Sequence, residues 1–242
     1  MSSVHVTPIP CLTDNYAYVL ERNGRAVVID PSEAGPVMKV LEAKGLKLEA
    51  VWNTHHHWDH VGGNRDLKKK YDCAVVGSWT DRYRVPEIDT TYEDGQTFLF
   101  AGMTVEVLAI PGHTVGAIAY YLPEVKSLFT GDTLFVMGCG RLFEGTPEQM
   151  WESLTRLMGL PKETLIYCGH EYAKSNAAFA RKVFPEDASI SRQVLELEAK
   201  LNNLQPSVPG TIEQELLTNP FLRAGNAERF AELRRLKDKF KG

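Results

Sequence analysis

The stretch NTHHHWDH, residues 53 to 60, concentrates side chains that bind divalent metals. It holds four of the seven histidines in a chain of 242 residues, and Asp59 stands among them. A catalytic zinc ion takes three protein ligands and keeps one position open for water. His55, His57, Asp59 and His60 exceed one such set, so the stretch predicts a metal site with room for more than one ion.

The spacing inside the stretch divides its members. In extended backbone, residues i and i+2 project to the same side, so His55 and His57 are expected to bind one ion. His56 then points elsewhere and packs locally or faces solvent. Asp59 and His60 follow a turn and face a second position nearby.

Other loops supply further ligands of the same kind. His113 stands in IPGHT, Asp132 in FTGDT and His170 in YCGHE, and each of these segments follows a β-rich run. Loops at strand ends are where open α/β sheets place ligand sites. A histidine tract can bind metal adventitiously, but a patterned H-x-H-x-D-H with three satellite loops favours a real site. Asp132 is the natural bridge between two ions, because a carboxylate has two oxygens whereas a metal-bound imidazole offers one nitrogen.

The expected elements explain where these loops lie. A β-hairpin is predicted over 16–30 with its turn at Asn23-Gly24, a dipeptide that suits tight hairpin turns. Further strands are expected at 48–52, 73–78, 94–113 (two strands), 118–122, 127–130 and 164–168. Helices are expected at 32–44, at 64–71 and from Thr146-Pro147 onward. From about residue 174 no strand is predicted, and helices are expected at 176–183, 192–203, 212–217 and 226–239. The chain is therefore divided into a mixed α/β domain, 1–173, and a small all-helical domain, 174–242.

Composition excludes several classes of function. The net charge of −4 gives no general attraction to nucleic acid or to an anionic membrane. No apolar run approaches the ~18–20 residues that cross a bilayer, and the first residues lack the pattern of a secretory signal. The four cysteines are scattered without a C-x-x-C pair, which favours reduced thiols and a cytoplasmic location. Cys139 and Cys168 lie near the ligand loops but are interpreted as packing residues.

These motifs resemble the metallo-β-lactamase superfamily of hydrolases. H-x-H-x-D-H followed by a later His, Asp and His is its pattern, and the resemblance covers nearly the whole chain. It implies an α/β fold, an αββα sandwich with a small C-terminal all-helical domain. The segments THHHWDHVGGN, IPGHTVGAIAYY, FTGDTLFVMGCGRLFEGT, YCGHEY and NPFLR are similar to one branch, the hydroxyacylglutathione hydrolases (glyoxalase II).

The resemblance implies a role for each site residue. The first metal would be bound by His55, His57 and His113, the second by Asp59, His60 and His170, with Asp132 bridging. Substrate contacts would come from Arg141, Phe143, Tyr172, Arg234 and Lys237. Arg141 stands where a lysine is usual, and can hold a carboxylate bidentately. Phe143 stands where a tyrosine is usual, and cannot donate a hydrogen bond.

The implied reaction is hydrolysis of S-(2-hydroxyacyl)glutathione, such as S-lactoylglutathione, to glutathione and a 2-hydroxy acid. This is the second step of methylglyoxal detoxification. A hydroxide held between two divalent ions would attack the thioester carbonyl, with Asp59 and Asp132 as catalytic residues. The ligand chemistry suits zinc, with iron and manganese as alternatives. The expected partner is a glutathione thioester, with neither nucleic acid nor membrane, and the expected state is a monomer.

The same ligand set is compatible with other functions. A lactonase, a β-lactamase or another thioesterase could use the same ligands, and so could a metal-dependent nuclease, although the acidic chain lacks a long basic stripe. A flavodiiron-type redox protein would carry a glutamate at the position of His57 and an attached flavin domain. A structural metal module would close its coordination shell, whereas this ligand set leaves room for solvent.

Overall fold

The computed structural model describes residues 3–241, which form two compact units. Among the described residues, unit 1 extends to Ala109 and includes Gly116–Val125, and unit 2 comprises Ile110–Val115 and the residues from Lys126 onward. Each unit contributes part of the residues singled out above.

Unit 1 contains a six-stranded sheet whose order follows the sequence. The first three strands are antiparallel, and the strands from β3 to β6 are parallel. Parallel strands end at the same edge of a sheet, so the loops that follow β3 and β4 are neighbours. The strands are β1 (Val4–Cys11), β2 (Asn15–Arg22), β3 (Arg25–Ile29), β4 (Lys47–Trp52), β5 (Ala74–Ser78) and β6 (Thr90–Tyr92).

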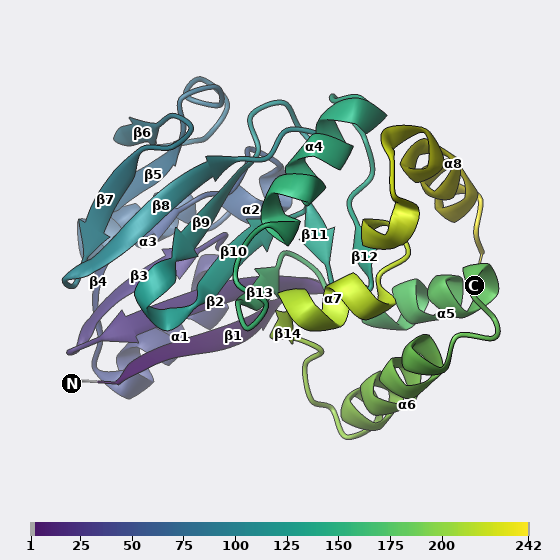
Figure 1. Ribbon diagram of the computed structural model, residues 1–242. Coiled ribbons are helices and arrows are strands. Elements are labelled where there is room, and N and C mark those ends of the chain that lie inside the picture. The colour runs from purple at the N-terminus through teal and green to yellow at the C-terminus, as the bar shows by residue number, and fades with distance from the viewer. Residues whose placement is uncertain (1–2, 242) are drawn as a thin grey trace. The chain divides into compact units, whose positions relative to one another are not determined.

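Two helices are packed on this sheet, α1 (Ala34–Lys44) and α3 (Asn64–Tyr71) (Figure 1). Val37 and Leu41 of α1 and Leu67 of α3 are buried in one cluster with alternate residues of the strands, among them Val28 and Val51. Burial of each such side chain contributes about 1.5–3 kcal/mol. The apolar core therefore holds the strand ends of unit 1 in place.

The remaining strands of unit 1 are antiparallel neighbours: β7 (Thr97–Phe100), β8 (Met103–Ala109) and β9 (Ile118–Leu122). Trp52 of β4 meets Phe98 and Phe100 edge-on, with ring centroids 5.1 and 5.7 Å apart, and lies 5.2 Å from Tyr120. Aromatic pairs of this geometry stabilise a core beyond their buried area. Trp52, the last residue of β4, therefore packs one β layer against the other.

Unit 2 combines short strands with helices. β10 (Ser127–Gly131) is parallel to β13 (Leu165–Cys168), and β14 (Gly210–Thr211) is antiparallel to β13. β11 (Leu134–Phe135) and β12 (Gly138–Cys139) form a small antiparallel pair. The helices are α4 (Pro147–Met158), α5 (Ala173–Val183), α6 (Ala188–Asn202), α7 (Ile212–Thr218) and α8 (Ala227–Asp238) (Figure 1).

Most expected elements are present near their expected bounds. The structure adds strands that were not predicted, namely β1, β6, β11, β12 and β14. The expectation of no strand beyond residue 174 is wrong at Gly210–Thr211, where two residues pair with Leu165 and Ile166 of β13. The division into domains 1–173 and 174–242 stays a prediction.

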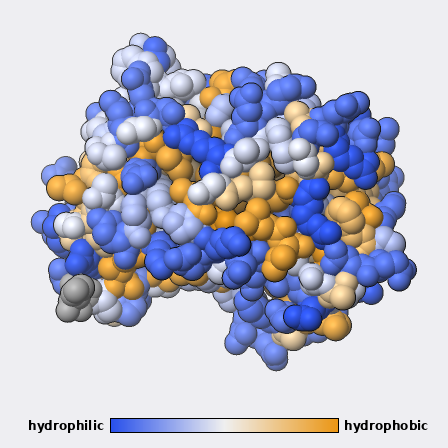
Figure 2. All heavy atoms as spheres, viewed as in Figure 1, coloured by the Kyte–Doolittle hydropathy of each residue, from blue (hydrophilic) through white to orange (hydrophobic). Residues whose placement is uncertain are grey.

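Within residues 3–241, no helix combines the length and the apolar character needed to cross a membrane. On the face drawn in Figure 2, hydrophilic residues alternate with smaller hydrophobic patches.

Candidate metal centre

The loop after β4 carries the predicted metal ligands of unit 1. Asn53, Thr54 and His55 are buried directly beyond Trp52, because the strand ends inside the core. Asp30, at the end of the neighbouring strand β3, accepts hydrogen bonds from the Thr54 amide (2.8 Å) and hydroxyl (2.6 Å). The carboxylate of Asp30 therefore fixes the start of the histidine stretch.

His55 and His57 direct ring nitrogens to one position. Nε2 of His55 lies 3.1 Å from Nδ1 of His57. Two nitrogens bound to one tetrahedral zinc ion at 2.0–2.1 Å lie about 3.3 Å apart. The other ring nitrogen of His55, Nδ1, lies 3.1 Å from the Thr54 hydroxyl. The distance between the two nitrogens fits binding to one ion, as the i, i+2 spacing of His55 and His57 predicts.

His60 is oriented by a carboxylate. It lies in the short helix α2 (Trp58–Val61), and its Nδ1 is 3.0 Å from Oδ2 of Asp30. A carboxylate on one imidazole nitrogen leaves the opposite nitrogen, Nε2, as the metal donor and raises its basicity. Oδ2 of Asp59 lies 3.8 Å from that Nε2. His60 and Asp59 therefore present their donor atoms to a common region.

Asp59 is also held by a neighbour. The side-chain amide of Asn15 donates to Oδ2 and to the backbone oxygen of Asp59, each at 3.0 Å. Asn15 begins strand β2 and is buried. A buried residue of a strand therefore holds one carboxylate oxygen of Asp59 in place.

His56 does pack locally. Its Nδ1 lies 3.1 Å from Oδ2 of Asp81, a carboxylate that is fully buried and also accepts from Arg84. His56 therefore faces away from the nitrogen pair of His55 and His57.

Unit 2 contains the other predicted ligands. Oδ2 of Asp132 lies 3.4 Å from Nε2 of His113 and 3.2 Å from Nε2 of His170. All three residues are at least nine-tenths buried. One carboxylate oxygen of Asp132 therefore lies within 3.4 Å of an imidazole nitrogen of each of the two histidines.

Close backbone contacts set the shape of these loops. Gly112 precedes His113 with φ of 153°, and a Cβ there would lie 2.7 Å from Cβ of Met150. A Cβ on Gly140 would lie 1.9 Å from the backbone oxygen of Asp132. Both positions require glycine, because any side chain would displace a ligand loop.

The ligands of unit 2 also have oriented rings. Nδ1 of His113 lies 2.8 Å from the backbone oxygen of Arg141, which leaves Nε2 for the metal. The ring of Tyr172 is stacked on His170, with centroids 4.7 Å apart and planes 4° from parallel. Phe143, 64% exposed, meets the His113 ring edge-on at 5.2 Å.

The donors of both groups are imidazole nitrogens and carboxylate oxygens, a set that fits zinc, iron or manganese. The thiols nearby do not compete. Burial raises the pKa of Cys139 to about 11 and that of Cys168 to about 12, so both stay protonated at neutral pH. A thiolate is the form that binds metal.

Three of the residues expected to contact the substrate are cations of unit 2 and are here called the basic group: Arg141, Arg234 and Lys237. Arg234 of α8 is 5% exposed, donates to the Cys139 carbonyl at 2.8 Å and lies 2.9 Å from Oδ1 of Asp238. Nε of Arg141 lies 3.8 Å from the same oxygen.

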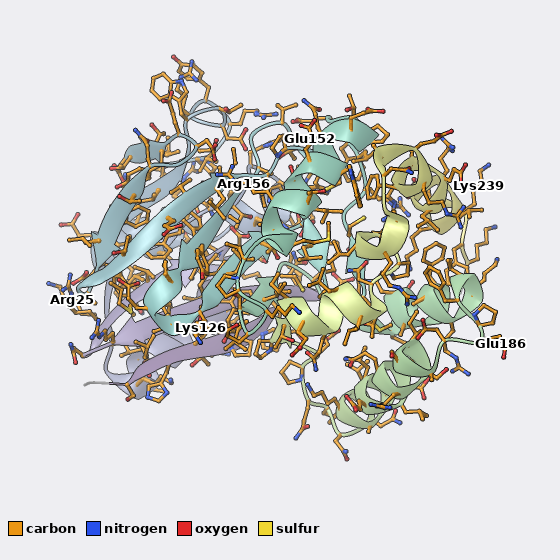
Figure 3. All side chains as sticks on the ribbon, viewed as in Figure 1. Arg25, Lys126, Glu152, Arg156, Glu186 and Lys239 are labelled. Atoms are coloured by element: carbon orange, nitrogen blue, oxygen red, sulfur yellow. The ribbon has the colours of Figure 1, made fainter. Side chains whose placement is uncertain are left out.

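Lys237, one helical turn from Arg234, donates to the backbone oxygen and hydroxyl of Ser175, both at 2.8 Å. Burial, with Arg234 and Arg141 nearby, lowers the pKa of Lys237 to about 8. Arg235 of α8 and Lys239, the C-cap residue that follows the helix, are both exposed, and Lys239 is labelled in Figure 3.

Sequence reasoning missed Asp30, Asn15 and Asp238. Asp30 has a recognisable signal, since a carboxylate directly after the strand run AVVI stands at the same sheet edge as the histidines. Its φ of 48° is unusual for a residue other than glycine, and marks a site held by its contacts. Asn15 and Asp238 carry no signal in a single sequence.

Known protein families and relatives match this chain over nearly its whole length. A model of the metallo-beta-lactamase superfamily matches residues 12–170, and one of the hydroxyacylglutathione hydrolase C-terminus matches residues 171–240. A hydroxyacylglutathione hydrolase from Methylococcus capsulatus is 44% identical, covering 99% of this chain and all of the relative. One from Pelagibacter ubique is 46% identical, covering 96% and 98%.

Solved structures give the same fold. ETHE1 from Myxococcus xanthus superposes with a TM-score of 0.73 at 27% identity, covering 96% of this chain and 90% of that one. TTHA1623, solved in a di-iron-bound form, gives 0.64 at 27% identity, covering 90% of this chain and all of that one. The predicted fold class is confirmed. The chain therefore belongs to the metallo-beta-lactamase superfamily and, within it, to the hydroxyacylglutathione hydrolases.

Proposed function

We propose that this protein hydrolyses S-(2-hydroxyacyl)glutathione, S-lactoylglutathione in particular, to glutathione and a 2-hydroxy acid. The observation that carries the proposal is similarity over the whole chain, including residues 171–240, to enzymes named for this reaction. The C-terminal match separates this function from that of a β-lactamase or a nuclease. The reaction belongs to the disposal of methylglyoxal.

The proposed cofactor is a pair of divalent ions. His55, His57 and His113 would hold the first ion, while Asp59, His60 and His170 would hold the second, with Asp132 as the bridge. The orientation of His55, His60 and His113 through Nδ1 supports this assignment. We propose zinc, with iron or manganese as alternatives. The structural relative TTHA1623 was solved in a di-iron-bound form, which supports iron as one of these alternatives.

When bound, the ions supply a deprotonated water at neutral pH and polarise the thioester carbonyl. The chain itself contributes orientation and exclusion of competing groups. Asp59, whose Oδ2 accepts a hydrogen bond from Asn15, would accept another from the attacking water and orient it. The departing thiolate is a weak base and leaves without prior protonation, so no general acid is needed.

The basic group provides the proposed hold on the tripeptide. Glutathione carries two carboxylates remote from the scissile bond, and Arg141, Arg234 and Lys237 are cations of the matching kind. Tyr172 and Phe143, stacked on or against ligand histidines, would contact the substrate beside the metals. We further propose a cytoplasmic monomer.

A substrate panel tests this function. Metal-loaded protein should hydrolyse S-lactoylglutathione far faster than nitrocefin, a simple lactone or RNA. Faster hydrolysis of nitrocefin would indicate a β-lactamase instead, faster hydrolysis of the lactone a lactonase, and faster hydrolysis of RNA a nuclease.

A further inference from the structure

The backbone of residues 135–139, here called the 135–139 turn, is held by side chains from far along the chain. Oε2 of Glu215 accepts a hydrogen bond from the amide of Met137 at 2.8 Å, and another from the side-chain amide of Asn219 at 2.8 Å. The Asn219 amide also donates to the carbonyl oxygens of Gly138 at 3.0 Å and of Phe135 at 3.4 Å. Helix α7 and its C-cap thus bind three backbone groups of one short turn.

These two side chains are fully enclosed. Glu215 is 1% exposed and Asn219 is 0% exposed. Burying a carboxyl group is costly, and an apolar residue of similar size would usually be at least as stable. An apolar residue at 215 would, however, leave the buried amide of Met137 without this acceptor, at a backbone φ of 54°.

The turn leads directly into residues of the proposed site. The carbonyl of Cys139, at its end, accepts from Arg234 at 2.8 Å. Two residues later, Arg141 provides both a cationic side chain and the backbone oxygen that faces Nδ1 of His113. A change in the shape of the turn would therefore displace Arg141 and Arg234 relative to each other.

We propose that Glu215 and Asn219 are positioning residues, which fix the 135–139 turn so that Arg141 and Arg234 meet the glutathione carboxylates. The inference rests on the proposed function. It assigns to helix α7 a role in substrate affinity, although neither side chain belongs to the metal ligands or the basic group. Burial raises the pKa of Glu215 to about 8, so the neutral acid, for which glutamine is isosteric, predominates at pH 7.

Hydrogen–deuterium exchange of the metal-loaded enzyme tests the first half of the proposal. In Glu215→Ala and in Asn219→Ala, the amides of residues 134–141 should exchange about ten-fold faster than in wild type, because a buried hydrogen bond is lost. Glu215→Gln should exchange at close to the wild-type rate, and strand β2 should be unaffected in all variants. Glu213→Ala, exposed on the same helix, is the matched control.

Steady-state kinetics tests the second half. Both alanine variants should raise KM for S-lactoylglutathione about ten-fold with a smaller change in kcat, because misplaced carboxylate contacts remove uniform binding. Glu215→Gln should restore KM to within about three-fold of wild type. If Glu215→Ala does not fold, Asn219→Ala carries both measurements.

Wild-type exchange of residues 134–141 in the alanine variants would overturn the proposal, and so would faster exchange without a rise in KM. Absence of S-lactoylglutathione hydrolysis in the wild-type enzyme is a different failure. It would refute the proposed function, while the exchange rates would still decide whether the pair holds the turn.

Discussion

Three of the proposed metal ligands have a hydrogen-bond partner on the nitrogen that points away from the expected ion. For His55 this partner is a hydroxyl, for His113 a backbone carbonyl and for His60 the carboxylate of Asp30. Such partners fix the tautomer and the ring direction. Asp30 deserves a test because it contacts both the Thr54 backbone and His60.

Asp30→Asn should lower metal affinity about ten- to hundred-fold, because the amide is a weaker acceptor for the His60 ring and the Thr54 donors. Competition with a chromophoric chelator measures the affinity. Asp66→Asn, exposed on α3, is the control. Equal affinity in both variants would mean that Asp30 has no role in orienting the ligands.

Lys237 gives a prediction about pH. Its pKa in the free enzyme is lowered to about 8 by burial and by Arg234. The charged form binds a carboxylate, so substrate affinity should be full below this pKa and lost above it. KM for S-lactoylglutathione should rise above pH 8, toward about ten-fold per pH unit, as the ammonium loses its proton. Lys237→Arg should remove this rise, because a guanidinium keeps its charge. A KM independent of pH between 7 and 9.5 in wild type would exclude Lys237 as the contact.

At the scale of elements, helix α8 presents two kinds of arginine. Arg234 is buried against the Cys139 carbonyl and Asp238, whereas its neighbour Arg235 is exposed. Substitution of Arg234 should therefore affect folding as well as binding.

Arg234→Ala should lower the free energy of unfolding by about 1.5–3 kcal/mol, because a charged hydrogen bond to a buried carbonyl is lost. It should also raise KM for the glutathione thioester several-fold. Arg235→Ala should stay within about 0.5 kcal/mol of wild type, as exposed substitutions usually do. Urea denaturation measures the free energy of unfolding of both variants, and steady-state kinetics measures KM. Equal stability of the two variants would contradict the burial of Arg234.

Elements with strong local patterns could be predicted from the sequence. The hairpin at Asn23-Gly24 and the helix from Thr146-Pro147 carry turn and capping residues, and both are present. β1 was missed because Pro8 and Pro10 disfavour a strand, although an edge strand tolerates proline. β11, β12 and β14 have two residues each, which is too short for any periodicity.

The same distinction applies to the site. The histidine motif and its satellites are marked by residue type and spacing, so the ligand candidates could be predicted. Some residues act by orienting another residue, and these pairs are far apart in the sequence: Asn15 and Asp59 by 44 positions, Glu215 and Met137 by 78. Only the fold brings such residues together, and one sequence contains no record of that proximity.

At the scale of the whole molecule, the proposed ligands are distributed over residues 55 to 170 of the sequence. An ion that binds only the folded chain stabilises it by mass action, by about 2.7 kcal/mol at a hundred times its Kd. Removing metal with a chelator should therefore lower Tm by about 5–10 °C for a chain of this size. Scanning calorimetry of the chelated and reconstituted protein measures the shift. An unchanged Tm, with metal removal verified by elemental analysis, would contradict the distributed ligand set.

The most direct test of the central claim is a titration of the metal-free protein with zinc while S-lactoylglutathione hydrolysis is followed. A two-ion thioester hydrolase is inactive without metal, and its activity should rise until about two equivalents are bound and then level off. Full activity at one equivalent would contradict the binuclear account, and hydrolysis by the verified metal-free protein would contradict the role of the metals altogether.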